Sequence, residues 1–471
     1  MRMVKQLNDK NVKYVMYACI AWLVFFYLFI AHLVELPGLL ESWWTYKGLI
    51  YYRDFATFHF PLGRWILLPF YLLTNWNLHT GPFLGLCTHI IAIIILARYG
   101  HRYFTKTGTA VALVFYTLFA WYLGTGIMFY HEMFVGLSLL LSFVYFSHLT
   151  ASQTSSSKDS YKLGILASLT ELAGQIVTPT LIVFSFLYLF ARPKKVIWYG
   201  VGLMLPLAIL SLYFLANNGF GDFFQQNFLY YTTYANSYQK VPFFQLPLKE
   251  LFLFYIPALL SFMYFVSHKK ISHRLLYVAS SALFVSTIPF IFLSVFHFHH
   301  VSFALPIGSI VVGFVFSYWK SLKLASLFVI ALSITLMPWH FQSVHTKNIG
   351  KVTNDLTVGD TMDQTVKWVE NNTPLNATIL VAGDALFYFS SDRNPSNKHV
   401  YVSPYNWEPL DQITAEVDKA LPDYWVINRT FFTRLLKEYK KEAMVQYLET
   451  SLLKSYTQMV VIDDWEVWEL R

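Results

Sequence analysis

The strongest constraint on this chain is a series of long apolar runs separated by short polar segments. Because a helix needs about 20 apolar residues to cross a bilayer, we expect a polytopic α-helical membrane protein with about eleven transmembrane helices. The predicted spans are residues 14–34, 81–99, 109–130, 133–149, 163–175, 176–191, 196–216, 250–267, 275–296, 301–319 and 324–339.

The composition agrees with this fold class. Charged residues make up only 13% of the chain and apolar residues 56%, whereas soluble domains are about 25% charged. The net charge of +8 does not indicate nucleic acid, because the basic residues lie in short clusters between apolar runs, where they act as topology signals. The two cysteines, Cys19 and Cys87, both lie in apolar runs, which excludes a disulfide framework and gives no support for a cysteine-based metal site.

The orientation in the membrane depends on residues 163–191, which could form one long span or two short ones. With two spans, most loop Lys and Arg residues fall on the side of the N-terminus, whereas with one span this asymmetry is lost. We therefore predict two spans, a cytoplasmic N-terminus and an extracytoplasmic C-terminus in the cytoplasmic membrane. The run 14–34 exceeds the roughly 7–15 residues of a signal-peptide core, so we expect it to remain as the first helix.

The chain changes character near residue 340. Amphipathic helical patterns in 359–372, 410–421 and 430–449 alternate with short apolar strand patterns in 377–383 and 423–429, and residues 456–470 have the pattern of a hairpin. This alternation predicts a small α/β domain. We expect a transmembrane domain, residues 1–340, and an extracytoplasmic α/β domain, residues 341–471.

The loop after the first apolar run, "GLIYYRDFATFHFPLGRW" (residues 48–65), carries four ionisable groups among aromatic residues: Arg53, Asp54, His59 and Arg64. On the predicted topology it is the first extracytoplasmic loop, and Pro61 starts an interfacial helix. Partial burial would raise the pKa of Asp54, and Arg53 would oppose that rise. Asp54 is therefore a candidate general base. Equally, Arg53 and Asp54 could be an ion pair that anchors the loop.

Other predicted outer ends also hold polar groups. They are Glu132, Glu171 with Gln175, the segment 217–240, and the histidines His297, His299 and His300. Ionisable groups near membrane depth tend to line functional cavities, so several on one side predict a single outward-facing site. Glu132 could also simply cap a helix. The histidines lack the spacing and the acidic partner of a metal motif, so we expect phosphate contacts or plain interfacial histidines, and no metal site.

Four stretches resemble the GT-C superfamily of membrane glycosyltransferases. Within it, the branch that looks most similar is the family of dolichyl-phosphate-mannose–protein mannosyltransferases and aminoarabinose transferases. The first outer loop carries that family's Gly, Tyr, Asp-Phe, His and Pro pattern at Gly48, Tyr51, Tyr52, Asp54, Phe55, His59 and Pro61. "FYHEMFVGLSLLLSFVYF" is similar to the second acidic motif, which maps to Glu132. "ILASLTELAGQIVTPTLIVFSFLYLFARPKK" resembles the paired short helices, although the family usually has Lys or Arg where Glu171 stands. "FHFHHVSFALPIGSIVVG" resembles the late outer loop with its His and Pro.

This resemblance implies an inverting transferase that takes a sugar from a polyprenyl-phosphate donor and passes it to a protein, lipid or glycan. Asp54 would be the base, with Glu132 as the second catalytic candidate. The candidate donor-binding residues are Arg53, His59, Arg64, Glu171, Lys240, His299 and His300. No cofactor is expected, and no motif indicates a divalent cation.

Two other classes remain open on the sequence. A flippase for lipid-linked sugars would also need polar groups at depth, but transporters usually place them near the midplane within internal repeats, and no repeat is visible. A structural scaffold would leave Asp54 and the polar outer loops without a role.

Overall fold

The computed structural model describes residues 10–29, 36–57, 59–122, 131–151, 156–229, 274–287, 302–318, 360–398, 410–430, 433 and 442–471. Contacts divide the chain into two units. A bundle unit comprises Met1–Glu35, Phe60–Ser211 and Gln239–Gly350, and a sheet unit comprises Leu36–His59, Leu212–Tyr238 and Lys351–Arg471. The predicted domain boundary at 340/341 lies outside the described residues and stays a prediction.

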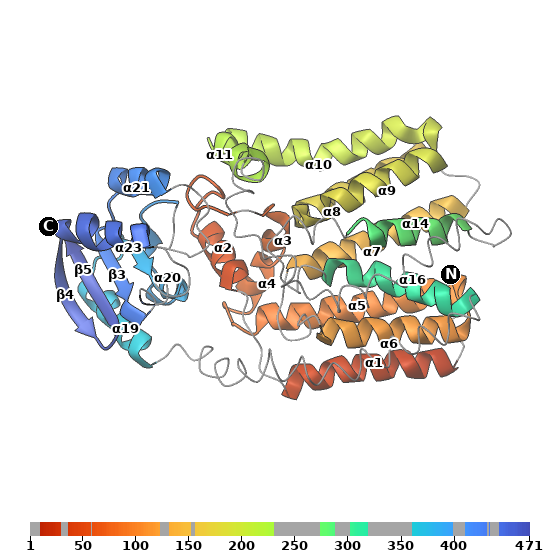
Figure 1. Ribbon diagram of the computed structural model, residues 1–471, viewed down its shortest axis with the longest axis horizontal. Coiled ribbons are helices and arrows are strands. Elements are labelled where there is room, and N and C mark those ends of the chain that lie inside the picture. Colours follow the sequence, from red (N-terminus) through yellow and green to blue (C-terminus); the bar gives the residue numbers. More distant parts are fainter. Residues whose placement is uncertain are drawn as a thin grey trace. The chain divides into compact units, whose positions relative to one another are not determined.

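The bundle unit consists of apolar helices that run side by side (Figure 1). By length and composition, the segments Thr80–Tyr103, Glu132–Ala151 and Pro193–Ala216 are long enough to cross a membrane among the residues described. The helices of the bundle unit that overlap predicted spans are α1 (Lys10–Phe29), α5 (Thr80–Tyr103), α6 (Lys106–Tyr122), α7 (His131–Ala151), α8 (Ser157–Ala173), α9 (Thr178–Ala191), the first part of α10 (Val196–Ala216), α14 (Arg274–Val285) and α16 (Leu305–Tyr318). The predicted spans 250–267 and 324–339 lie outside the described residues.

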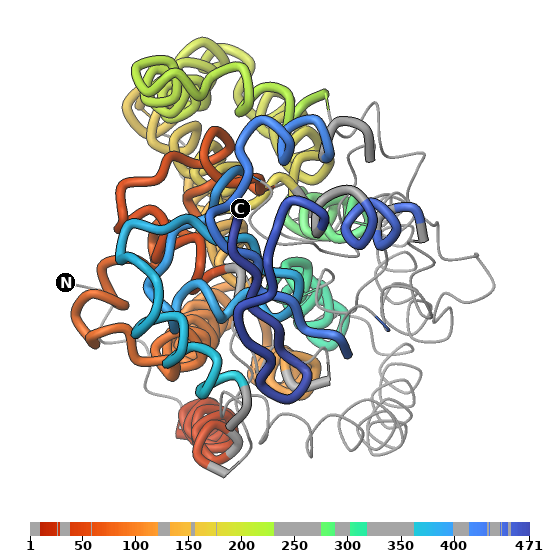
Figure 2. Tube along the Cα trace, turned by 90° about the vertical axis from the view of Figure 1, so that its left-hand side faces the viewer, coloured from red at the N-terminus to blue at the C-terminus, as the bar shows by residue number. Residues whose placement is uncertain are grey.

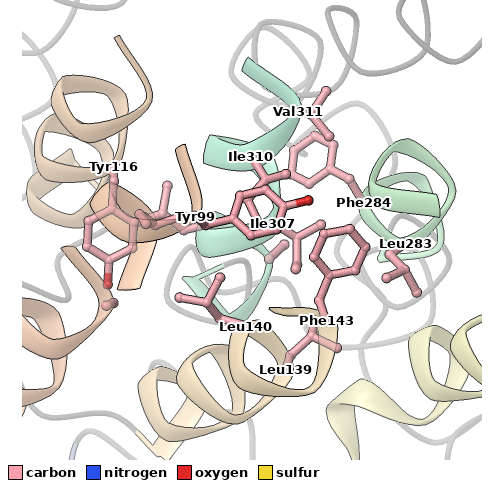
Figure 3. Close-up of a cluster of buried hydrophobic side chains, with 14 of the residues drawn as sticks. Tyr99, Tyr116, Leu139, Leu140, Phe143, Leu283, Phe284, Ile307, Ile310 and Val311 are labelled. Atoms are coloured by element: carbon pink, nitrogen blue, oxygen red, sulfur yellow. The ribbon is translucent and has the colours of Figure 1, made fainter. Parts of the chain in front are cut away.

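The core of the bundle unit is built from aromatic and branched side chains that different helices contribute (Figure 3). Tyr99 of α5, Phe143 of α7 and Ile307 of α16 are each at most 3% exposed. Small residues let backbones approach elsewhere: a Cβ atom at Gly164 of α8 would clash with the backbone of α10 at Tyr199. Such close approach at small residues is typical of helices packed in membranes.

Residues 163–191 form two antiparallel helices. The hydroxyl of Tyr188, near the end of α9, donates to Ser160 near the start of α8 over 2.5 Å, and at the other end Thr178 donates to Glu171. Gly174 and the short 3₁₀ turn η2 (Gln175–Val177) separate the two helices. The structure thus has a helical hairpin here, as the two-span prediction requires, although helices of 17 and 14 residues measure only about 25 and 21 Å.

Two short helices, α3 (Leu62–Trp65) and α4 (Leu68–Leu73), lie where we predicted one interfacial helix. Pro61 directly precedes α3, as expected. Residues Ile66 and Leu67 form a turn that separates the two. Helix α3 packs against α7 and α8.

The sheet unit contains a five-stranded mixed sheet with strand order β2-β1-β3-β5-β4. β1 is parallel to β2 and β3, while β5 is antiparallel to β3 and β4. Figure 2 shows β4 and β5 as the dark blue hairpin near the C-terminus. The strands are β1 (Thr378–Ala382), β2 (Asn394–Pro395), β3 (Tyr424–Asn428), β4 (Tyr456–Ile462) and β5 (Trp465–Leu470), and the helices are α19 (Asp360–Asn372), α20 (Leu386–Ser391), α21 (Leu410–Lys419) and α23 (Glu442–Tyr447).

The central strands are buried on both faces. Leu380 and Trp425 lie in the cluster with α21 and α23. Val381 and Val426 alternate with them, and all four residues are at most 1% exposed. Two-sided burial explains why β1 and β3 have continuous apolar runs in the sequence. The predicted strands 377–383 and 423–429, the hairpin and the helices at 359–372 and 410–421 are found, while α20 and β2 were not predicted.

Two segments from the N-terminal half belong to the sheet unit. Helix α2 (Leu36–Tyr46) packs on α20, with the rings of Trp44 and Tyr388 5.8 Å apart. Lys47 pairs with Asp392 over 2.5 Å. The second segment contains α11 (Phe220–Phe224) and a π-helical turn, Gln225–Leu229. These segments carry and surround the loop of Asp54.

Candidate functional site

Asp54 lies in a tight turn that its own carboxylate helps to close. The backbone N–H of Asp54 donates to the carbonyl of Ile50 over 2.9 Å, and the N–H of Ile50 donates to Asp54 Oδ2 over 2.7 Å. Tyr52, inside this turn, has φ = 67°. A left-handed tyrosine is uncommon and persists where its surroundings hold it. The position of the carboxylate is therefore set by the backbone of residues 50–55.

Arg53 forms a bidentate ion pair with Asp54 through Nε and Nη2. Its Nε donates to Oδ1 and its Nη2 to Oδ2, both over 2.7 Å, and its Nη1 donates to the carbonyl of Asn217 over 2.8 Å. The side chain of Arg53 is 39% exposed and that of Asp54 is 23% exposed. The described residues use three of the five guanidinium N–H groups, so two remain for an incoming acceptor. Asp54 Oδ1 accepts one hydrogen bond from the described residues and retains a second acceptor position.

Two opposing effects set the pKa of Asp54. Burial alone would raise the pKa, but the hydrogen bonds from Arg53 and Ile50, together with the Arg53 charge, outweigh it and bring the pKa below its ordinary value. Burial and Arg53 thus have the opposite effects on the pKa of Asp54 that the sequence predicts. The carboxylate is ionised near neutral pH.

Two buried side chains outside the motif hold this turn. Glu41, in α2, accepts hydrogen bonds from the hydroxyls of Tyr51 and Thr57, each over 2.9 Å. Gln226 donates to the carbonyl of Tyr52 and accepts from the N–H of Thr57, each over 3.0 Å. Neither Glu41 nor Gln226 was a predicted site residue. The only available signals were a polar residue in the apolar segment 36–46 for Glu41 and the polar stretch 217–240 for Gln226.

A second carboxylate, Asp222, belongs to the same neighbourhood. It lies 3.6 Å from Lys398 Nζ, which also pairs with Glu416 over 2.8 Å. Burial raises the pKa of Asp222, and Lys398 opposes that rise. The carbonyl of Lys398 in turn accepts the N–H of Ala56 over 2.8 Å. His59 is half-buried, and its carbonyl accepts the Tyr52 hydroxyl over 2.7 Å.

The bundle unit holds the other predicted site residues that are described. Arg64 lies in α3, which packs on α7 and α8. Glu132 is in the first turn of α7, as predicted, and is 1% exposed. Glu171, in the last turn of α8, accepts a hydrogen bond from Thr178, and Gln175 in the adjacent turn accepts the N–H of Phe60 over 3.1 Å.

Arg64 differs from the expectation of an interfacial residue. Its side chain is only 2% exposed, because α3 packs against α7 and α8.

Several predicted residues cannot be placed. Lys240, His297, His299 and His300 lie outside the described residues, so their proposed phosphate contacts stay predictions. Among the part of the chain that is described, no group of three or more His, Cys, Asp or Glu side chains could hold a metal ion. Whether the residues of the two units form one site also remains a prediction.

Solved structures show which fold this is. ArnT, an aminoarabinose transferase from Cupriavidus metallidurans, matches when bound to undecaprenyl phosphate with a TM-score of 0.62 and 11% identity, over 96% of this chain and 97% of that one. The apo form of ArnT matches with a TM-score of 0.58, 11% identity and coverage of 97% of each chain. The Archaeoglobus fulgidus oligosaccharyltransferase matches with a TM-score of 0.53 and 10% identity, over 96% of this chain and 73% of that one.

No family model matches the sequence, and no curated protein matches it either. The similar structures are GT-C proteins, and the likeness extends over almost the whole chain. The predicted resemblance to the GT-C superfamily is therefore confirmed for the fold. The chain has the architecture of a multi-pass membrane protein of this type.

Proposed function

We propose that this chain is a membrane glycosyltransferase that moves a sugar from a polyprenyl-phosphate donor to an acceptor protein, lipid or glycan at the outer face of the cytoplasmic membrane. The fold supports a transferase, and one of the similar structures holds undecaprenyl phosphate. The observation that carries the proposal is the Arg53–Asp54 pair, which puts an ionised carboxylate beside a guanidinium with unused N–H groups.

In the proposed reaction, Asp54 Oδ1 takes the proton from the acceptor. The acceptor oxygen or nitrogen forms a bond to the anomeric carbon while the bond from that carbon to the phosphate oxygen breaks. The electron pair leaves with the polyprenyl phosphate, and attack from the opposite side inverts the anomeric centre. Phosphate is a good leaving group, so one positioned base suffices and no metal cofactor forms part of the proposal.

The leaving phosphate gains charge as that bond breaks. Donors aimed at such charge stabilise the transition state, and the two remaining N–H groups of Arg53 match phosphate oxygens. Because the same guanidinium holds Asp54, it would bring base and donor together. Glu132 is the second catalytic candidate. The proposed substrate-binding set also includes His59, Arg64, Glu171, Lys240, His299 and His300.

The proposed arrangement in the membrane has the N-terminus in the cytoplasm. Residues 1–340 would form the transmembrane part and residues 341–471 an extracytoplasmic α/β domain. The number of spans, about eleven, follows from the apolar runs.

The proposal is tested with purified protein in detergent, a panel of radiolabelled undecaprenyl-phosphate sugars and a cell-envelope fraction as acceptor. A glycosyltransferase releases undecaprenyl phosphate and leaves the label on the acceptor. A flippase makes no covalent product in detergent, but moves a fluorescent lipid-linked sugar across vesicles that contain it. Translocation without transfer from any donor in the panel would overturn the proposal.

A further inference from the structure

Gln226 stands out because its side chain makes the same kind of contact as a strand partner. Its amide bridges the carbonyl of Tyr52 and the N–H of Thr57, over 3.0 Å in both cases. These two backbone groups flank Asp54 in the sequence. Gln226 lies 174 residues after Tyr52 and 169 residues after Thr57 in the chain. It is 2% exposed.

The bridge holds the strained part of the turn. Tyr52 is the left-handed residue, with φ = 67°, and a conformation of this kind persists only where contacts around it compensate. Gln226 fixes its carbonyl, which belongs to the peptide bond that leads to Arg53. Rotation of that peptide would move the Arg53–Asp54 pair away from the Ile50 N–H, which now donates to Asp54 Oδ2.

The local backbone of Gln226 is also unusual. It lies in the π-helical turn Gln225–Leu229, and π-turns occur frequently at functional sites. Its neighbour Asn227 is buried too, but among the described residues its side chain donates only to Phe223 within the same segment. Of these two adjacent amides, the described contacts therefore join only Gln226 to the backbone of residues 52–57.

We infer that Gln226 is a positioning residue that fixes the Asp54 carboxylate by clamping the backbone on both sides of it. The catalytic part of this inference rests on the proposed function, whereas the clamp itself does not. Gln226 touches neither donor nor acceptor in this account. It acts through the backbone of residues 52–57.

The test compares Gln226→Leu and Gln226→Glu with Asn227→Leu, each as the full-length protein in detergent. Hydrogen–deuterium exchange reports the clamp directly, because the N–H of Thr57 has Gln226 as its acceptor. We expect exchange across residues 50–57 to become at least tenfold faster in Gln226→Leu. Gln226→Glu keeps the acceptor for Thr57 but loses the donor to Tyr52, so its effect should be intermediate. Asn227→Leu should exchange like the wild type.

The catalytic consequence is measured with the same variants. A small displacement of a catalytic group can cost about 10²-fold in rate, so we expect turnover of a labelled undecaprenyl-phosphate sugar to fall about 10- to 100-fold in Gln226→Leu. Binding of undecaprenyl phosphate should not change. A variant that is merely unstable would lose binding and turnover together.

Each outcome decides the inference. Unchanged exchange in residues 50–57 of both Gln226 variants overturns it, whether or not the wild type transfers sugar. Faster exchange with wild-type turnover also overturns it, since the clamp would then have no bearing on catalysis. If the wild type transfers no sugar, the proposed function fails, and the exchange rates alone decide whether Gln226 fixes the carboxylate.

Discussion

Asp54 accepts hydrogen bonds from Arg53 and Ile50 that favour its ionised form. Because the pKa of this carboxyl is lowered, the side chain is ionised at neutral and mildly acidic pH, as the proposed base has to be. Protonation sets in only as the pH falls through the lowered pKa. The stability that the ionised form contributes is likewise present above the ordinary pKa of an aspartate and lost below the lowered one.

This pairing predicts how Arg53→Lys changes the pH dependence. Lysine keeps the charge but cannot donate side-on with two N–H groups, so the pKa of Asp54 should rise toward its ordinary value. The acid limb of the pH–turnover profile should then move to higher pH, and turnover at neutral pH should fall as the phosphate contact is lost. The measurement is turnover of a labelled undecaprenyl-phosphate sugar from about pH 2.5 to about pH 7, a range that spans the ordinary pKa of aspartate, about 3.9.

A matched control exists in the sheet unit. Arg429 forms the same bidentate ion pair with Glu466, with Nε and Nη2 each 2.8 Å from a carboxylate oxygen. Arg429→Lys should leave the profile unchanged. Identical profiles for the wild type and Arg53→Lys would contradict the role of Arg53.

Arg64 leads to a different prediction, because its side chain is 2% exposed. Truncating a large buried side chain to alanine costs about 2–5 kcal/mol, so Arg64→Ala should lower the free energy of unfolding by an amount of that order. Arg53→Ala removes a side chain that is 39% exposed and should cost far less. Thermal unfolding of both variants in detergent measures the difference. Equal unfolding temperatures would contradict a contribution of the buried Arg64 side chain to stability.

At the scale of residues, interactions between neighbours in the chain can be predicted from the sequence, whereas the burial of a side chain cannot. Arg53 and Asp54 are neighbours in the chain, so their pairing and its effect on the pKa follow from adjacency. The burial of Arg64 depends on how α3 packs against α7 and α8, which no local pattern contains. The contacts of Glu41 and Gln226 likewise join residues far apart in the sequence.

At the scale of elements, the predicted topology of every span after residue 191 depends on the hairpin of α8 and α9. Apolar runs predict where the helices lie, since a span requires about 20 such residues. The turn at Gly174 separates the two helices, and the hydrogen bond between Tyr188 and Ser160 shows that they run antiparallel. In the sequence, only the charge asymmetry distinguishes one helix from two. Short elements such as α20 and β2 escaped prediction because they carry no periodic pattern of useful length.

The hairpin leads to a labelling experiment. In a Cys87→Ser background, Lys194→Cys and Gln225→Cys place exposed thiols after α9 and after α10. With the predicted topology, a membrane-impermeant maleimide should label Gln225→Cys in intact cells and Lys194→Cys only after permeabilisation. Cys19 is buried and serves as the internal background. Labelling of both positions from the same side would contradict the two-span topology.

At the scale of the whole molecule, the loop of Asp54 belongs to the same unit as the C-terminal sheet. Trp44 packs against Tyr388, and Ala56 donates to the carbonyl of Lys398. The sequence predicts the sheet from its alternating elements, and the resemblance to GT-C proteins predicts the overall fold. The contacts of the C-terminal segment with the loop of Asp54 and with α2 could not be predicted. They join residues more than 300 positions apart and follow from tertiary packing alone.

We propose that this molecule transfers sugar from a polyprenyl phosphate with Asp54 as the base. Two carboxylates in the sheet unit can be compared, because Asp222 also acts on Arg53 through its charge. Asp54→Asn keeps the size of the side chain but removes the basic oxygen, and Asp222→Asn makes the same change at the second site. General-base catalysis contributes about 10²–10⁴-fold in rate.

The decisive measurement is therefore the single-turnover rate of transfer from a radiolabelled undecaprenyl-phosphate sugar for the wild type, Asp54→Asn and Asp222→Asn. We predict that Asp54→Asn is slower by about 10²–10⁴-fold while it still binds undecaprenyl phosphate, and that Asp222→Asn stays close to the wild type. Full transfer by Asp54→Asn would contradict the account and direct attention to Glu132.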